Sequence, residues 1–256
     1  MRILISNDDG IYADGIGELR KAMEQIADEV YVVAPDRERS ACGHGITVTR
    51  PLRAKIHRFK SGKAKGWVVD GTPADCVKLG LESILEGPPD LVVSGINLGP
   101  NLGTDVLYSG TVSAAFEGVI NHVPAIAVSL AAWEKFDYKA AADFMKEFVP
   151  LVMANPVDPG TLLNVNVPNH YDGRGVRVTR LARRRYIKCF DKRVDPRGKI
   201  YFWMAGEPHN LDEDDPETDA AAINEGFVSV TPLQLDVTDY AFRKKWPAGC
   251  RPSRFF

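Results

Sequence analysis

The chain has 256 residues, of which 45% are hydrophobic and 26% are charged, a composition typical of a globular protein. Its formal net charge of −2 provides no bulk attraction to nucleic acid or to an anionic membrane, so neither is expected as a partner. The sequence shows no pattern of a signal peptide and no run of the roughly 18 apolar residues that a membrane helix needs. Cys42, Cys76, Cys189 and Cys250 form no CxxC pair, which argues against a disulfide framework and against a structural zinc site. Together these features predict a cytoplasmic protein.

Short apolar runs alternate with amphipathic segments over the first two-thirds of the chain. The predicted strands cover residues 2–6, 30–35, 66–70, 90–95, 125–130 and 162–167, and the predicted helices cover 16–27, 74–86, 111–121 and 138–154. This alternation is typical of βαβ units, and strands that are apolar on both faces indicate a sheet covered on both sides. We therefore expect a three-layer, Rossmann-like α/β core with a mostly parallel sheet over residues 1–170.

The remainder, residues 171–256, differs from the first part in composition and in its pattern of apolar residues. Residues 169–210 are rich in arginine, aromatic and turn residues and predict a long β-hairpin arm with residues 191–198 at its tip. An acidic surface loop that could hold a short helix follows at 211–226, then one more strand within 227–240, and an aromatic and basic tail. Without an internal repeat or a disordered linker, residues 1–256 are expected to form a single domain with an appended arm.

Polar segments follow the predicted strands. They are Asn7–Gly10 after the first strand, Pro35–Ser40 after the second, Asp70–Asp75 after the third and Ser94–Gly103 after the fourth. Ligands of open α/β sheets bind beyond the carboxyl ends of the strands. The four segments are therefore expected to converge on one edge of the sheet.

Asp8 and Asp9 are the first candidates for chemistry. Within a strand they would point to opposite faces, but in a turn relaxed by Gly10 both can face the crevice. Two close carboxylates repel each other unless a cation neutralises them, although turn chemistry alone explains an isolated NDDG equally well. Ser40 and Asn97, each of which taken singly reads as a loop or turn residue, add oxygen donors. The five histidines show no ligand spacing, so the set favours Mg²⁺ or Mn²⁺ over zinc.

Small hydroxyl residues and a glycine open the third predicted helix, at Ser109, Gly110 and Thr111. Free N–H groups and the positive end of the helix dipole favour a phosphate there, and ordinary N-capping is the alternative explanation. A divalent cation beside such a site indicates phosphoryl chemistry. No GxGxxG, GxxxxGK[ST] or GxSxG motif is present, which argues against the dinucleotide, P-loop and α/β-hydrolase classes.

Taken together, these motifs resemble the survival protein SurE family of metal-dependent nucleoside-monophosphate phosphatases. The matching segments are ILISNDDG, VVAPDRERS, DGTPADCV, DLVVSGINLGPN, YSGTVSAAFEG, TLLNVNVP and FVSVTPL. They run from residue 3 to about residue 233 in the order that the family shows. Seven motifs with compatible spacing are a far more specific signal than a single glycine-rich loop.

The resemblance implies a role for each matching residue. One divalent ion per subunit, Mg²⁺ or Mn²⁺, would be bound by Asp8, Asp9, Ser40 and Asn97, with either aspartate as a catalytic base. Asn101, Ser109, Gly110 and Thr111 would surround the phosphate of the substrate. It further implies hydrolysis of nucleoside 5′- and often 3′-monophosphates, in some members of short polyphosphate, and a homodimer or homotetramer assembled through the arms. The segment 41–47 departs from the serine-rich stretch common in the family, which leaves the substrate preference open.

Two alternatives from other classes remain open at this point. One is a non-catalytic nucleotide- or phosphate-binding protein on the same fold, against which the intact set of metal-ligand candidates argues. The other is RNA binding through Arg183, Arg184, Arg185 and Tyr186 on the arm, although such a cluster is more often solvated or intersubunit and the net charge gives it little support. His44 is an alternative acid or base for the phosphatase, or an ordinary loop histidine.

Overall fold

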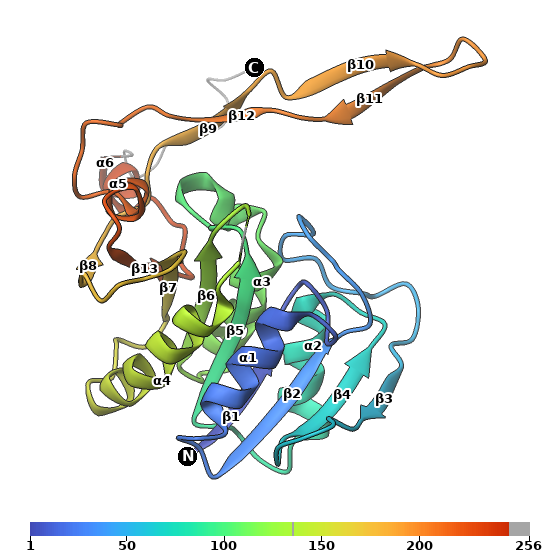
Figure 1. Cartoon of the computed structure of the whole chain (residues 1–256), viewed down its shortest axis with the longest axis vertical. Helices are drawn as coiled ribbons and strands as arrows, with labels where there is room; N and C mark the ends of the chain where they lie inside the picture. Colours follow the sequence, from blue (N-terminus) through green and yellow to red (C-terminus); the bar gives the residue numbers. More distant parts are fainter. Residues whose placement is uncertain (135, 246–256) are drawn as a thin grey trace.

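A nine-stranded sheet forms the centre of the computed structural model, which describes residues 1–134 and 136–245 (Figure 1). The strand order is β3-β4-β2-β1-β5-β6-β7-β13-β8, and all neighbours are parallel except β3 with β4 and β7 with β13. The strands are β1 Arg2–Ser6, β2 Glu29–Pro35, β3 Ala54–His57, β4 Lys65–Val69, β5 Leu91–Leu98, β6 Ala125–Ala131, β7 Thr161–Pro168, β8 Val176–Val178 and β13 Val228–Gln234. The predicted mostly parallel sheet is confirmed.

Helices cover both faces of this sheet. They are α1 Asp14–Met23, α2 Pro73–Leu79, α3 Gly110–Ile120 and α4 Tyr138–Ala154, followed by the short helices α5 Asp219–Asn224 and α6 Tyr240–Lys245. In β1, Ile3 and Ile5 belong to the apolar core beneath α1 and α4, whereas Leu4 belongs to the core beneath α2 and α3. The three-layer α/β architecture predicted from the two-sided apolar strands is therefore confirmed.

Several boundaries differ from the sequence-based prediction. The helix predicted at 74–86 is wrong in its second half: α2 ends at Leu79 and a π-helical turn follows over Gly80–Ile84, in which the N–H of Leu85 donates to the carbonyl of Gly80 at 3.0 Å. The helix predicted at 16–27 begins two residues earlier and ends at Met23. The strands β3 and β8 were missed because most of their residues are exposed and show no apolar alternation. The central sheet also recruits β8 and β13 from beyond residue 170.

The predicted arm is a long antiparallel ribbon that extends away from the sheet (Figure 1). Its base pairs β9 Arg184–Ile187 with β12 Glu207–Asn210, and its outer part pairs β10 Phe190–Val194 with β11 Ile200–Met204. The tip is a tight turn over residues 195–199, shorter than the predicted 191–198, because residues 191–194 continue the strand. The end of the predicted aromatic and basic tail lies outside the described residues.

Two further sequence expectations can be compared with the described part of the chain. Cys42, Cys76 and Cys189 carry free thiols, and Cys250 lies outside the residues described. Among residues 1–134 and 136–245, none of the helices has the length and apolar character needed to cross a membrane.

Candidate active site

The turn after β1 lies at the topological switch point of the sheet. β1 pairs with β2 on one side and with β5 on the other. The order of the strands therefore reverses its direction across the sheet at β1. In open α/β sheets a crevice forms outside the carboxyl end of the strand at such a point. Asp8 and Asp9 follow β1 at this position, as the sequence predicted.

Asn7 and Gly10 shape this turn. The side chain of Asn7 accepts the N–H of Gly10 at 3.2 Å and donates to the carbonyl of Gly10 at 3.0 Å. Gly10 has a φ of +94°, and an added Cβ would lie 3.0 Å from the backbone carbon of Arg37. Only glycine fits this conformation and this close approach. Asp8 and Asp9 therefore lie in a turn, where their side chains need not point to opposite faces as they would within a strand.

Asp8 lies against the start of α3. Its side chain is almost fully buried, and one carboxylate oxygen accepts the hydroxyl of Thr111. An added Cβ on Gly110 would lie 2.8 Å from the Cβ of Asp8, so the glycine permits this contact. Ser109 caps the helix, since its Oγ accepts the N–H of Val112 at 3.1 Å. The predicted anion site and the first predicted metal ligand are thus in direct contact.

Asp9 is connected to the end of β5. Its Oδ2 accepts the N–H of Leu98 at 3.3 Å, and the amide nitrogen of Asn97 donates to the carbonyls of Leu98 and Gly99. The pairing of β5 with β6 is irregular between Ser94 and Asn97, which changes the direction of the strand at this point. The bonds found for Asn97 among the described residues use only its amide nitrogen, and its neighbour Leu98 is bonded to Asp9.

The loop after β2 brings Ser40 and Glu38 toward the two aspartates. The N–H of Arg39 donates to the backbone carbonyl of Asp8 at 2.7 Å, and Oγ of the exposed Ser40 donates to Glu38 at 2.8 Å. Glu38 was not singled out from the sequence. Its only sequence signal was a charge inside the DRERS segment, which is equally typical of a solvated loop.

Burial and mutual repulsion disfavour the ionised carboxylates. Burial raises the pKa of Asp8, and burial together with the charge of Asp8 raises the pKa of Asp9 to about 7. Glu38 adds a smaller increase to both pKa values. A cation at this position would relieve the repulsion.

The available donors fit a hard divalent cation. Within the described ranges, no group of three or more histidine, cysteine, aspartate or glutamate side chains could hold a metal ion. An ion beside Asp8 and Asp9 would therefore need neutral oxygens as well, and Ser40 and Asn97 carry such oxygens on the neighbouring segments. An all-oxygen set of this kind suits Mg²⁺ or Mn²⁺.

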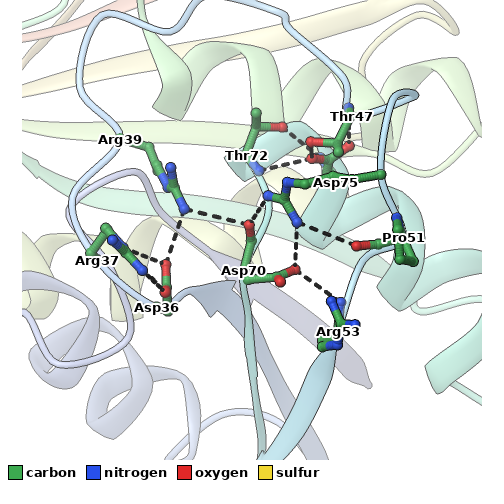
Figure 2. A network of polar contacts seen from close by, with 10 residues as sticks. Asp36, Arg37, Arg39, Thr47, Pro51, Arg53, Asp70, Thr72 and Asp75 are labelled. Atoms are coloured by element: carbon green, nitrogen blue, oxygen red, sulfur yellow. Dashed lines mark hydrogen bonds and ion pairs between the residues drawn. The ribbon is translucent and has the colours of Figure 1, made fainter.

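A polar network holds the loop after β2 and the residues that follow it (Figure 2). Asp36 forms an ion pair with Arg39 at 3.2 Å. Asp75 closes a capping box at the start of α2, where Thr72 and Asp75 each accept the backbone N–H of the other, and Asp75 also accepts the hydroxyl and N–H of Thr47. Burial opposes ionisation of Asp75, but the bonds from Thr47 and Thr72 outweigh it and lower its pKa. The loop that carries Ser40 is thereby fixed at both of its ends.

Asn101 is buried beside β6 and β7. Its amide nitrogen donates to Oγ of Ser129 at 2.8 Å, and its backbone is bonded by side chains of β7. In the part of the chain that the structure describes, the hydrogen bonds found for Asn101 connect it to these strands and not to Asp8, Asp9 or α3. The structure therefore places Asn101 in the segment that leads to the site without bonding it to the acidic pair.

Two other candidates from the sequence have structural partners. His44 Nε2 lies 2.8 Å from Oε1 of the buried Glu117, which directs the imidazole toward the middle of α3. Arg184 forms a largely buried ion pair with Asp105 at 2.9 Å. Arg184 is therefore held in a structural ion pair, whereas Arg183, Arg185 and Tyr186 are exposed. The carboxylate of Glu117 sets the orientation of the His44 imidazole.

The fold and the site together define a Rossmann-like α/β protein with an acidic, oxygen-donor crevice beside a helix N-terminus at the switch point. The family model for survival protein SurE matches residues 3–188. The chain belongs to the SurE family.

The similarity to known proteins covers nearly the whole chain. The 5′-nucleotidase SurE of Desulforamulus reducens is 80% identical over 254 residues, which cover 99% of this chain and 100% of that protein. The 5′-nucleotidase SurE of Pelotomaculum thermopropionicum is 60% identical and covers 96% of this chain and 93% of its own. The crystal structure of the SurE protein from Aquifex aeolicus is 43% identical, with a TM-score of 0.83 over 96% of this chain and 98% of that chain.

Proposed function

We propose that this protein is a metal-dependent 5′-nucleotidase that hydrolyses nucleoside 5′-monophosphates to nucleoside and phosphate. The observation that carries the proposal is the contact between Asp8 and the start of α3, which joins a cation site to an anion site. Relatives named 5′-nucleotidase SurE at 80% and 60% identity support the same activity.

The metal site is proposed to consist of Asp8, Asp9, Ser40 and Asn97, with one Mg²⁺ or Mn²⁺ ion per subunit. When bound, such an ion supplies a Lewis acid that polarises a phosphoryl oxygen. Asp9 is the better candidate for the general base that accepts the proton of the attacking water. It is less buried than Asp8, whose carboxylate already accepts the hydroxyl of Thr111.

The phosphate is proposed to lie at the start of α3. The hydroxyl of Ser109 is used to cap the helix, so the backbone N–H groups of the first turn, around Gly110 and Thr111, are the donors offered to phosphoryl oxygens. Asn101 would contribute the part of its amide that is not bonded to Ser129. Because these contacts recognise a phosphoryl group and not a base, the proposal extends to 3′-monophosphates and short polyphosphate.

A homodimer or homotetramer is proposed to form through the arm. One face of its outer part carries Phe190, Lys192, Val194, Ile200, Phe202 and Met204, because directly opposed residues of an antiparallel pair share a face. The five apolar members are all at least half exposed, and an isolated two-stranded ribbon is marginally stable in water. A second copy of the chain would cover this face.

The free thiols suit the reducing cytoplasm, which we propose as the compartment.

Release of inorganic phosphate from a panel of nucleoside 5′- and 3′-monophosphates tests the proposed activity. We expect release with added Mg²⁺ or Mn²⁺ and loss of release after exhaustive chelation, with recovery when the ion is returned. Undiminished activity in chelator would contradict the metal assignment. Binding of a nucleotide without turnover under every metal condition would instead favour a non-catalytic binding protein.

A further inference from the structure

Two asparagines lie in the middle of the buried sheet. Asn164 and Asn166 on β7 are fully buried, and they share the face of the strand that carries Leu162 in the core beneath α2 and α3. A strand buried on both faces is normally filled with Val, Ile and Leu. An amide in such a position is unfavourable unless it is hydrogen-bonded.

Both asparagines bond to the backbone of one residue in the loop after β5. The side chain of Asn166 accepts the N–H of Asn101 at 2.8 Å and donates to its carbonyl at 3.0 Å. Asn164 donates to the same carbonyl at 2.9 Å. The Asn166 amide thus pairs with Asn101 as the backbone of a neighbouring strand would.

The side chain of Asn101 is fixed as well. One N–H of its amide donates to Oγ of Ser129 on β6 at 2.8 Å. Its second N–H and its oxygen take part in none of the hydrogen bonds found among the described residues. Four hydrogen bonds from three side chains therefore set the position of Asn101 and leave part of its amide for a ligand.

The bonding of Asn164 shows that this arrangement is not the least costly way to fill the strand. Its Oδ1 is buried without a hydrogen-bond partner among the residues described. A buried polar atom without a protein partner carries a desolvation cost. An apolar side chain would fill the same space without that cost but could not hold the Asn101 carbonyl.

We infer that Asn166, assisted by Asn164, is a positioning residue that holds Asn101 in the orientation in which it binds phosphate. Neither asparagine of β7 touches the substrate in this arrangement. The inference rests on the proposed function, which places Asn101 beside the phosphate. Fixing a binding group before the ligand arrives removes the entropic cost of ordering it on binding.

A double-mutant cycle between Asn166→Leu and Asn101→Ala tests the inference in the holoenzyme with Mg²⁺. The readouts are the Kd of inorganic phosphate by calorimetry, and kcat and KM for a nucleoside 5′-monophosphate. We expect each single variant to weaken phosphate binding and to raise KM by about tenfold, with kcat changed by less than about threefold, as for loss of one charge-assisted hydrogen bond made equally in the ground and transition states. In the Asn101→Ala background, Asn166→Leu should have almost no further effect on either readout.

The matched control is Ser229→Ala. Ser229 is fully buried directly beside Asn166 in the register of β13 with β7, but its hydroxyl lies 2.9 Å from that of Thr179 and not on Asn101. We expect the control to lower the melting temperature without changing phosphate affinity. If Asn166→Leu does not fold, Asn164→Leu takes its place in the cycle with an expected effect of about threefold, because it removes one of two donors to the carbonyl.

Equal effects of Asn166→Leu with and without the Asn101 side chain would overturn the inference, since they would indicate a general structural role. Wild-type phosphate affinity in Asn166→Leu or in Asn101→Ala would overturn it as well. The phosphate titrations need no turnover. Absence of nucleotide hydrolysis by the wild-type protein would therefore contradict the proposed function while the binding cycle still decides the inference.

Discussion

At the scale of single residues, Asp8 and Asp9 place two carboxylates in a desolvated turn. Asp8→Asn keeps the size of the side chain but removes one charge. We expect it to weaken Mg²⁺ or Mn²⁺ binding and to lower kcat/KM by at least about 100-fold. In chelator the variant should melt at a higher temperature than the wild type, because burial raises the pKa of Asp8 and its charge raises that of Asp9.

Paired calorimetric metal titrations and thermal melts check this prediction. Asn97→Ala is the comparison variant, since it removes a neutral donor and should cost less metal affinity than Asp8→Asn. Wild-type metal affinity in Asp8→Asn would show that Asp8 does not bind the ion.

The pH dependence of the metal-free protein follows from the same pair. The pKa of Asp9 is raised from 3.8 to about 7 in the folded state, so the folded protein holds a proton that the unfolded chain has lost between these values. The free energy of unfolding should therefore fall as the pH rises from about 4 to about 7 and level off above that. Asp8, whose pKa is also raised, acts in the same direction.

Urea unfolding in chelator at a series of pH values measures this dependence. Asp9→Asn should make the decline shallower, whereas the exposed Asp214→Asn should leave it unchanged. A stability that rises between pH 5 and pH 7 by an amount that Asp9→Asn abolishes would contradict the assignment.

Whether the role of a residue can be predicted from the sequence depends on how far along the chain its partner lies. Asp8, Asp9 and Gly10 could be identified because the turn that frees the carboxylates is encoded by adjacent residues. The rule that strand ends share an edge predicted the convergence of four polar segments, but it did not predict the contact of Asp8 with Thr111, which lies at a helix start outside those segments. The bonds from Asn166 to Asn101 span 65 positions, and inside a strand pattern an asparagine gives no sign of its partner.

At the scale of elements, α5 connects the arm to the loop that leads to the site. Asp219, at the first position of α5, is fully buried and accepts the N–H groups of Gly103, Ala182 and Ala220 at 2.8–2.9 Å. Gly103 begins the 3-10 helix over Gly103–Leu107, and Ala182 precedes β9. One carboxylate therefore joins three segments that are distant in the sequence.

Asp219→Ala should leave these three buried N–H groups unpaired and lower the free energy of unfolding by about 3 kcal/mol. Chemical unfolding of the wild type and the variant measures the difference. Asp214→Ala in the preceding acidic loop is the control, and as an exposed substitution it should change stability by less than about 0.5 kcal/mol. A loss of stability no larger than that of the control would contradict the stabilising role of the three hydrogen bonds that Asp219 accepts.

Element existence was more predictable than element boundaries. Six of the seven strands and the four α-helices that the structure describes in the first 170 residues were found from their apolar periodicity, whereas the exposed strand β3 was missed. The end of α2 could not be found in this way, since the apolar pattern continues through Gly80 while the hydrogen bonding changes to the π-helical turn. The strand β8 depends on pairing with β13, which no local pattern encodes.

At the scale of the whole molecule, the exposed apolar face of the arm predicts self-association. Phe202→Asp places a charge in the centre of that face, opposite Lys192. We expect sedimentation at micromolar concentration to show an oligomer for the wild type and a smaller species for the variant. The variant loses a large apolar side chain, and its carboxylate, even when paired with Lys192, would have to leave water in the interface.

Glu86→Lys makes a larger change of charge at an exposed position after the π-helical turn, away from the arm, and should leave the assembly intact. A monomeric wild-type protein under these conditions would count against assembly through the arm.

The ribbon that carries this face also has a kinetic consequence. Among the described residues, its outer strands β10 and β11 pair only with each other, and most of their side chains are exposed. Within this part of one subunit, little besides the hydrogen bonds between the two strands slows their opening. Backbone amides of β10 and β11 should therefore exchange with deuterium orders of magnitude faster than those of β1 and β5 in a dissociated subunit. Contact with a second copy would slow exchange in the ribbon alone, so the deuterium uptake of residues 190–204 would report dissociation of subunits long before the core unfolds.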